Sequence, residues 1–227
     1  MSRGLFVTGT DTDCGKTFVA AELIRRIRAT GLRVAGFKPV AAGAGLSDGE
    51  LRNDDALTLM EASGLALPHR AVNPYCLAPP VAPHIAAAEA GVEIRLQPVL
   101  DAYRQLLAFS DLVVVEGAGG WAVPLADGFD MADLALGLDL PVLLVVGLRL
   151  GCINHARLSE QAILAGGARL VGWVGSQVDP AMPRLGENLD TLGRLLSVPC
   201  LGVLTRAPSK SLEQALDIPR LLEALGG

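Results

Sequence analysis

The stretch Gly9-Thr10-Asp11-Thr12-Asp13-Cys14-Gly15-Lys16-Thr17 decides the fold. It follows a short apolar run, Leu5-Phe6-Val7, and precedes a helical pattern over residues 17–30 whose apolar side chains share one face. A glycine-containing turn between a strand and a helix is the setting of a phosphate-binding P-loop. Its glycines let successive backbone N–H groups point into one concavity, and the helix N-terminus adds partial positive charge. The sequence therefore predicts a nucleoside triphosphate as ligand.

Two side chains of this loop carry expected roles. Lys16 would reach the β- and γ-phosphate oxygens, and Thr17 would place its hydroxyl on Mg²⁺. The usual spacing needs a glycine at position 10, but this chain has Thr10 there and its glycine is Gly9. A chance Gly-Lys-Thr in a turn is the competing interpretation. The position between a strand and an amphipathic helix argues against it.

Apolar runs and helical patterns alternate along the rest of the chain. Further strands are predicted at 34–37, 112–115, 142–146, 170–174 and 201–204. Further helices are predicted at 51–63, 95–109, 154–165, 185–196 and about 211–225, and an irregular, proline-rich segment at 71–83. This order indicates an α/β fold of P-loop NTPase type: a mostly parallel twisted sheet covered by helices on both faces. We expect a single P-loop NTPase-like domain over residues 1–227.

Composition excludes several function classes. The net charge is −5 and aromatic residues make up 4 %, which does not suit a nucleic-acid-binding protein. The longest apolar run, at 140–148, is too short to cross a bilayer, so no membrane association is expected. The N-terminus shows no signal-peptide pattern, and the 4 cysteines form no CxxC pair. We therefore expect a reduced, cytoplasmic protein.

Carboxylates at two places are candidate metal ligands. Glu116 ends the predicted strand at 112–115, and glycines follow it that would let the backbone approach phosphates. A P-loop NTPase uses a carboxylate at such a strand end to hold Mg²⁺, although an ordinary strand end is the competing interpretation. Asp54 and Asp55 lie at a helix start, where they either cap the helix or turn one carboxylate to the metal. The sequence leaves these two possibilities open.

Further motifs are spread over most of the chain. They are Lys38-Pro39-Val40, Leu51-Arg52-Asn53 with Asp55, Asn73-Pro74-Tyr75, Pro83-His84, Glu116-Gly117-Ala118-Gly119-Gly120-Trp121 and Gly151-Cys152-Ile153-Asn154-His155. Together with the loop at 9–17, they resemble the dethiobiotin synthetase family up to about residue 175. The resemblance implies that CO₂ forms a carbamate on 7,8-diaminononanoate, that ATP phosphorylates this carbamate, and that the second amine closes a ring. The products would be dethiobiotin, ADP and phosphate.

The resemblance also implies roles for particular residues. Lys38 would be the catalytic cation that touches the carbamate and the γ-phosphate, with Lys16 as the second catalytic lysine. Taken alone, a lysine before Pro39 favours a solvated side chain before a turn. The implied Mg²⁺ ligands are Thr17, Asp55 and Glu116. The implied nucleotide contacts are Asp13, Cys14, Gly15, Lys16, Thr17, Phe18, Asp55, Glu116, Gly117, Ala118 and Gly119.

A homodimer is implied as well, with the substrate carboxylate held near its interface. Residues 151–154 open a helix whose free N–H groups could bind that carboxylate, although Asn154 would also serve as a plain N-cap. The chain departs from the family pattern at Ala42, Ser176-Gln177, Thr205-Arg206 and Asn188. These departures lie at the periphery of the phosphate chemistry, and they leave the preference for the nucleotide base open.

Three other functions compete with this interpretation. A P-loop switch or partitioning ATPase often carries a signature lysine at the position that Asp11 occupies here, which argues against that class. A related ATP-dependent amide-forming ligase usually has a glutaminase domain, for which this chain has no room. A plain phosphotransferase would release ADP without any dependence on the diamine.

Overall fold

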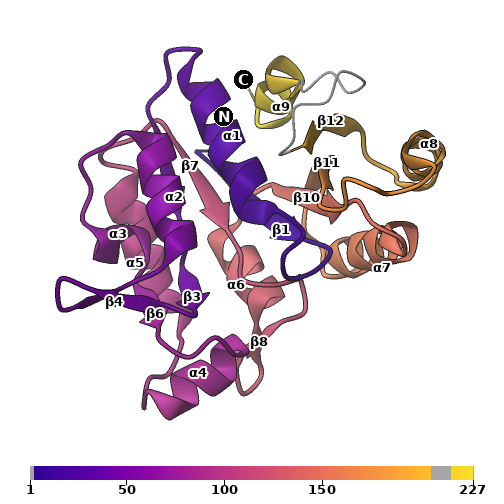
Figure 1. Cartoon of the computed structure of the whole chain (residues 1–227). Helices are drawn as coiled ribbons and strands as arrows, with labels where there is room; N and C mark the ends of the chain where they lie inside the picture. Colours follow the sequence, from indigo (N-terminus) through magenta and orange to yellow (C-terminus); the bar gives the residue numbers. More distant parts are fainter. Residues whose placement is uncertain (1–2, 206–215, 227) are drawn as a thin grey trace.

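Parallel strands run through the middle of the molecule (Figure 1). The computed structural model describes residues 3–205 and 216–226. These residues form a 6-stranded sheet in the order β12 (Cys200–Thr205), β11 (Leu170–Gln177), β10 (Val142–Gly147), β1 (Gly4–Gly9), β7 (Leu112–Glu116) and β2 (Val34–Phe37). All of its pairings are parallel. The predicted strands are confirmed, and most of them extend a little beyond the predicted ends.

Helices cover both faces of this sheet (Figure 1). One face carries α1 (Lys16–Arg28), α2 (Asp54–Ser63) and α9 (Ile218–Ala224). The other face carries α4 (Pro83–Glu89), α5 (Leu96–Leu106), α6 (Met131–Leu138), α7 (Cys152–Ala165) and α8 (Leu185–Leu195). Side chains along β1 alternate between the two cores: Leu5 and Val7 join the first, and Phe6 joins the second. Burial on both faces explains why the strands are continuous apolar runs.

The strand register brings the functional segments to one edge of the sheet. Val7 of β1 is opposite Glu116 of β7, and Phe37 of β2 is opposite Val115. Because the strands are parallel, the turns that follow β1, β2 and β7 all leave from their carboxyl ends. The loop at 9–17, Lys38 and Glu116 therefore meet, although they are far apart in the sequence.

Two predicted segments differ from the structure. The helix predicted at 51–63 begins only at Asp54, because β5 (Glu50–Arg52) pairs with β4 (Gly45–Ser47). The segment at 71–83 is not irregular throughout, since β6 (Tyr75–Leu77) pairs with β3 (Val40–Ala42). The strands β3 and β6 pair across a long stretch of chain, so their own sequences give little signal. The hairpin of β4 and β5 is local, and its Asp48-Gly49 turn was a signal that the prediction did not use. The helix α3 (His69–Val72) and the hairpin of β8 (Pro124–Ala126) with β9 (Phe129–Asp130) were also not predicted.

The carboxyl-terminal helix is shorter in the described region than predicted. It begins at Ile218, after the N-cap residue Asp217, and residues 211–215 of the predicted helix lie outside the described part. Across residues 3–205 and 216–226, no helix combines the length and the apolar character needed to cross a bilayer.

Candidate active site

The loop at 9–17 is shaped by two glycines that have little space around them. Gly15 has φ +92°, a backbone conformation that favours glycine, and a Cβ there would lie 2.1 Å from Ser176 Oγ. A Cβ on Gly9 would lie 2.3 Å from Cys14 Sγ. The buried Cys14 thiol therefore explains why this loop needs its glycine at position 9, where the usual pattern allows other residues.

A cavity of about 1260 Å³ opens beside this loop. Its lining includes both predicted lysines, Lys16 and Lys38, which therefore face a common space. Nearly all of the predicted nucleotide contacts line it as well: Asp13, Gly15, Thr17, Phe18, Asp55, Glu116, Ala118 and Gly119. Cys14 and Gly117 lie outside this lining. Because the Cys14 side chain is fully buried behind the loop, any contact of Cys14 with a nucleotide has to come from its backbone.

Lys38 is held at the floor of the cavity. It follows β2, only 3 % of the residue is exposed, and Nζ donates to Glu116 Oε1 at 2.6 Å and to Asp55 Oδ2 at 2.8 Å. The interpretation of a solvated lysine is therefore wrong. Burial by itself lowers the pKa of Lys38, but the adjacent carboxylates outweigh it and the pKa is raised. The side chain is a cation at neutral pH.

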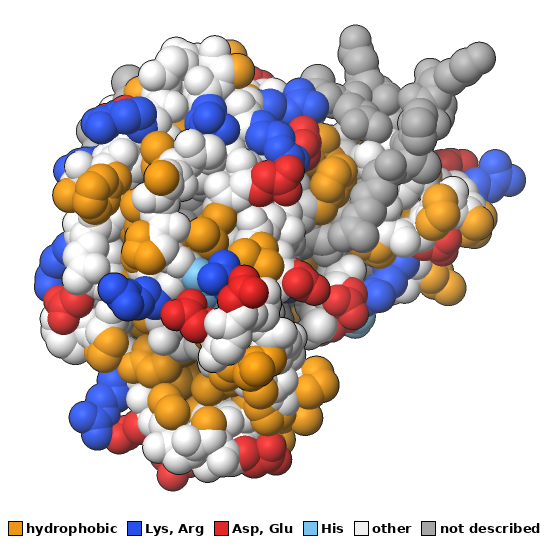
Figure 2. All heavy atoms as spheres, turned by 60° about the vertical axis from the view of Figure 1, so that its left-hand side comes forward, with side chains coloured by type: hydrophobic (Ala, Val, Ile, Leu, Met, Phe, Trp, Pro, Cys, Tyr) orange, Lys and Arg blue, Asp and Glu red, His pale blue; other side chains and the backbone are white. Residues whose placement is uncertain are grey.

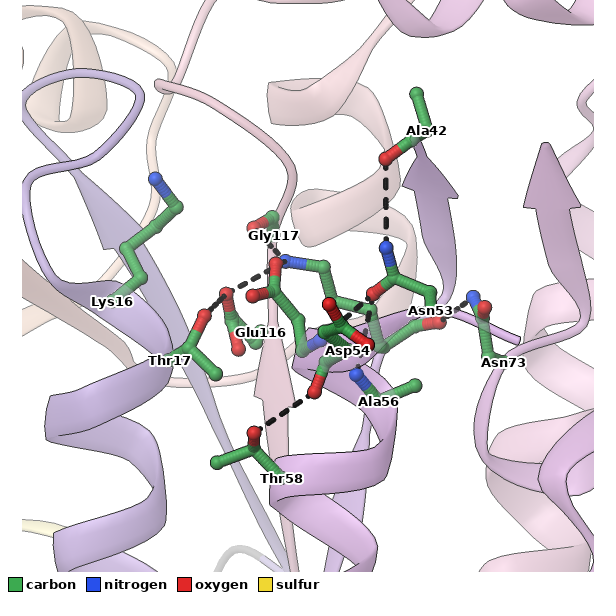
Figure 3. A network of polar contacts seen from close by, with 12 residues as sticks. Lys16, Thr17, Ala42, Asn53, Asp54, Ala56, Thr58, Asn73, Glu116 and Gly117 are labelled. Carbon is green, nitrogen blue, oxygen red and sulfur yellow. Dashed lines mark hydrogen bonds and ion pairs between the residues drawn. The ribbon is translucent and has the colours of Figure 1, made fainter. Parts of the chain in front are cut away.

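Two asparagines position this cluster, a role that the sequence motifs had not revealed. Asn53 Oδ1 accepts from the backbone N–H groups of Asp55 at 3.1 Å and Ala56 at 3.3 Å, which makes Asn53 the N-cap of α2. The interpretation that the two aspartates cap this helix is wrong, because Asp55 turns inward to Lys38. Asn73 Nδ2 donates to the backbone oxygen of Lys38 at 2.6 Å (Figure 3). Asparagine is a preferred N-cap residue, so its place directly before a predicted helix could have identified Asn53 as the cap.

Thr17, Asp55 and Glu116 come together from α1, α2 and β7. Thr17 Oγ1 donates to Glu116 Oε1 at 2.8 Å (Figure 3). The buried Glu116 Oε2 has no hydrogen-bond partner among the described residues. Burial raises the pKa of Asp55, but Lys38 and Thr17 more than offset this effect, so the pKa lies below its usual value.

The same three residues fit a magnesium ion. Mg²⁺ prefers oxygen ligands, and proteins usually offer it one or two carboxylates beside substrate phosphates. A hydroxyl, two carboxylates and the unpaired buried Glu116 Oε2 match this preference. Within the described ranges, no group of three or more His, Cys, Asp and Glu side chains could hold a metal ion. The ion would therefore also need the Thr17 hydroxyl and the substrate phosphates as ligands.

Lys16 lies on the loop side of the cavity (Figure 3). Its Nζ donates to the backbone oxygen of Asp11 at 2.8 Å. The Asp11 carboxylate forms an ion pair with Arg149, and it also accepts from the Thr12 N–H at 2.8 Å. The residue at the signature-lysine position therefore stabilises the loop itself and brings no positive charge to the phosphates.

The cavity is also lined by Gln177, Val178 and Thr205. Two of these residues belong to the segments that depart from the family pattern, and Arg206 lies outside the described residues. Ala42 also lines the cavity, and its backbone oxygen accepts from Asn53 Nδ2 at 3.5 Å.

Gly151, with φ +96°, is the N-cap of α7, so the interpretation of Asn154 as that cap is wrong. Asn188, in the first turns of α8, donates from Nδ2 to the backbone oxygen of Arg184, the N-cap of that helix, at 2.8 Å.

The chain is similar to known proteins over most of its length. A family model described as an AAA domain matches residues 3–214. The ATP-dependent dethiobiotin synthetase BioD of Xylella fastidiosa strain Temecula1 is 51 % identical over 203 residues, which cover 89 % of this chain and 90 % of that protein. The corresponding protein of Pseudomonas aeruginosa strain LESB58 is 54 % identical over 202 residues, 88 % of this chain and 89 % of that protein. The chain belongs to the dethiobiotin synthetase family. The resemblance seen in the motifs is confirmed, and this member of the dethiobiotin synthetase family is an ATP-dependent ligase.

Solved structures confirm the fold of this dethiobiotin synthetase family member. The septum site-determining protein MinD of Pyrococcus horikoshii, complexed with Mg-ADP, has a TM-score of 0.57 at 17 % identity and covers 100 % of this chain and 91 % of that one. A ParA family ATPase of Chlorobium tepidum has a TM-score of 0.55 at 13 % identity and covers 98 % and 94 %. At such identities the likeness concerns the fold alone.

Proposed function

We propose that this chain makes dethiobiotin from 7,8-diaminononanoate, CO₂ and ATP. The observation that carries the proposal is the buried ammonium of Lys38, which shares one cavity with the phosphate-loop residue Lys16. The reaction has to bring two anions, a carbamate and a triphosphate, within bonding distance. Preorganised cations in a site that excludes water are the usual solution to such repulsion.

The chemistry proceeds in three balanced steps. One amine of the diamine adds to CO₂ and loses a proton, which gives a carbamate. A carbamate oxygen attacks the γ-phosphorus of ATP and ADP leaves, so a carbamic–phosphoric anhydride forms. The second amine attacks the carbonyl carbon, loses a proton and expels phosphate, which closes the cyclic urea of dethiobiotin.

This chain's residues position and neutralise the reactants. Lys38 would contact the carbamate and the γ-phosphate from the floor of the cavity, and Lys16 would contact the phosphates from the loop. The backbone N–H groups at the start of α1 would add further donors for the phosphates. Phosphoryl transfer asks for little covalent chemistry from the protein, so positioning and charge neutralisation account for most of the catalysis.

A magnesium ion is part of the proposal. Thr17, Asp55 and Glu116 would hold it beside the nucleotide phosphates, where it would supply positive charge to the oxygens of the transferred group. The orphaned Glu116 Oε2 supports this assignment, because a buried carboxylate oxygen without a partner is costly.

A homodimer is the second structural part of the proposal. Leu150, 92 % exposed, lies two residues before α7, and Leu158 on α7 is 56 % exposed. Apolar side chains also gather over the α4 end (Figure 2), where Val81, Ile85 and Val92 are each at least 40 % exposed. Exposed apolar surface of this kind favours association. The cytoplasmic location and the single domain over 1–227 stay predictions.

The direct test is a product assay with purified protein. Mg-ATP, bicarbonate and 7,8-diaminononanoate are incubated with the protein, and dethiobiotin is identified by mass. We expect equal amounts of dethiobiotin, ADP and phosphate, and no phosphate without the diamine. Phosphate release that ignores the diamine would contradict the proposal and would favour a switch or partitioning ATPase. Repeating the assay with GTP and CTP measures the base preference.

A further inference from the structure

The Lys38 ammonium lies at the point where the proposed metal ligands converge. Its Nζ is 2.6 Å from Glu116 Oε1 and 2.8 Å from Asp55 Oδ2. The hydroxyl of Thr17 donates to the same Glu116 oxygen at 2.8 Å. The side chains of Lys38 and Glu116 are only 4 % and 1 % exposed. A single buried cation therefore joins two carboxylates that the proposed function assigns to a different cation.

Two carboxylates that contact the same buried group need positive charge beside them, although only Glu116 is buried and the Asp55 side chain is 43 % exposed. Without it, they repel each other, and one of them tends to take up a proton. Lys38 provides this charge in the structure, and its contacts use one oxygen of each carboxylate, while Glu116 Oε2 is left without a partner among the described residues. A Mg²⁺ ion held by the same two carboxyl groups would lie beside these oxygens whether it used Glu116 Oε1 or Oε2. An ammonium bonded to those oxygens would then lie in direct repulsion with it.

We propose that Lys38 and Mg²⁺ are alternative cations of one site. In the metal-free protein, Lys38 neutralises Asp55 and Glu116, and it gives up these carboxylates when a divalent ion takes them. The inference rests on the proposed function only in taking Thr17, Asp55 and Glu116 as metal ligands. It adds that the catalytic lysine is held back before the metal–nucleotide complex arrives.

The consequence concerns the timing of catalysis. A lysine is a compact charge on a flexible four-carbon stem, so its ammonium can turn from one set of oxygens to another without movement of β2. Once released, Lys38 becomes available to the carbamate and the γ-phosphate. An empty site therefore offers these anions a lysine that is already paired, and a metal-loaded site offers them a free one.

The first test measures Mg²⁺ binding to nucleotide-free protein by calorimetry. Lys38→Met removes the competing charge and keeps most of the side-chain length. Lys16→Met is the matched control, because it removes a second charge from the same cavity whose hydrogen bond goes to the Asp11 backbone and whose charge acts on Asp55 less than that of Lys38. We expect Lys38→Met to bind Mg²⁺ at least about tenfold more tightly than wild type, and Lys16→Met to resemble wild type. Equal affinity in wild type and Lys38→Met would overturn the proposal.

The second test needs no Lys38 variant, which guards against a Lys38→Met protein that does not fold. The sequence contains three lysines, Lys16, Lys38 and Lys210. With ¹³C at Cε of lysine, nucleotide-free wild type gives three signals; Lys16→Met and Lys210→Met assign two of them, and the third belongs to Lys38. We expect added Mg²⁺ to shift the Lys38 signal much more than the other two. Saturable binding of Mg²⁺ that leaves the Lys38 signal unchanged would show that both cations fit together, and would overturn the proposal.

These outcomes are separate from those of the product assay. A protein that makes no dethiobiotin but shows the expected competition would contradict the proposed function and leave the shared cation site standing. A protein that makes dethiobiotin but shows no competition between Lys38 and Mg²⁺ would support the proposed function and overturn the shared cation site.

Discussion

The strands β2 and β7 carry an ion pair at each of their two ends. Arg33 and Asp111 precede the paired strands and form one pair; Lys38, directly after β2, and Glu116, the last residue of β7, form the other. The side chains of the first pair are 60 % and 39 % exposed, whereas those of the second are 4 % and 1 % exposed. Both pairs join the same strands in the same register. They therefore differ mainly in how far water reaches their side chains.

Burial decides how much each of these ion pairs matters to the stability of the protein. Water screens Arg33 and Asp111, which link the strand ends and contribute little to stability. Lys38 and Glu116 are shielded from water, and breaking their contact would leave an uncompensated charge in the interior. The buried pair also lies at the carboxyl edge of the sheet, where parallel α/β folds bind their ligands.

The largest expected effect is on catalysis at the buried end. Lys38→Ala should fold and bind nucleotide but lose turnover by at least ~100-fold, because a preorganised cation is missing when charge develops on the transferred group. Steady-state dethiobiotin formation and ADP binding by calorimetry measure the two quantities. Arg33→Ala is the control at the other end of the strands and should keep normal turnover. Near-normal turnover of Lys38→Ala would remove Lys38 from the mechanism.

The second effect is on stability at the same end. Lys38→Met should lower the free energy of unfolding by about 3 kcal/mol, because Glu116 stays buried beside Asp55 without its cation. The double variant Lys38→Met/Glu116→Gln should recover most of this loss, since both charges are gone. Urea unfolding of the three proteins checks the prediction. A double variant as unstable as Lys38→Met would point to lost packing as the cause.

The third prediction concerns acid pH. The pKa of Asp55 is lower in the folded protein than its ordinary value of 3.8. The stability that Asp55 contributes is therefore fully present above pH 3.8 and is lost as the pH falls through the lower folded value. The difference in unfolding free energy between wild type and Asp55→Asn should shrink below pH 3.8. The same difference measured in a Lys38→Met background should be much smaller at every pH.

The smallest effect is expected at the exposed end. Arg33 lowers the pKa of Asp111 from 3.8 to about 2, mainly through a hydrogen bond, so any stabilisation by Asp111 is lost between these pH values. At neutral pH, Asp111→Asn should lower Tm by less than about 4 °C. High salt should remove most of this change. A larger change that persists in high salt would contradict the distinction between the two ends.

Much of the fold could be predicted because its signals are local. The apolar runs of β1, β7 and β10 and the helical periods of α1, α5 and α8 lie within short windows of sequence. The predictions missed the local hairpin of β4 and β5 despite its Asp48-Gly49 turn, and they failed at β3 and β6 because these strands pair across a long stretch of chain. The site was only partly predictable for the same reason: Glu116 followed from a strand end, but the inward turn of Asp55 depends on the cap at Asn53 and on Lys38.

The sequence by itself determined the phosphate loop and the family, because a strand, a glycine turn and a helix are contiguous and the motifs keep their spacing. Only the tertiary structure decided that Lys38 is a buried cation between two carboxylates. Its partners are 17 and 78 residues away along the chain, and they reach it because parallel strands end at the same edge of the sheet. The carboxylates that raise its pKa, and the burial that shields the pair from water, are properties of that meeting point and of no single segment.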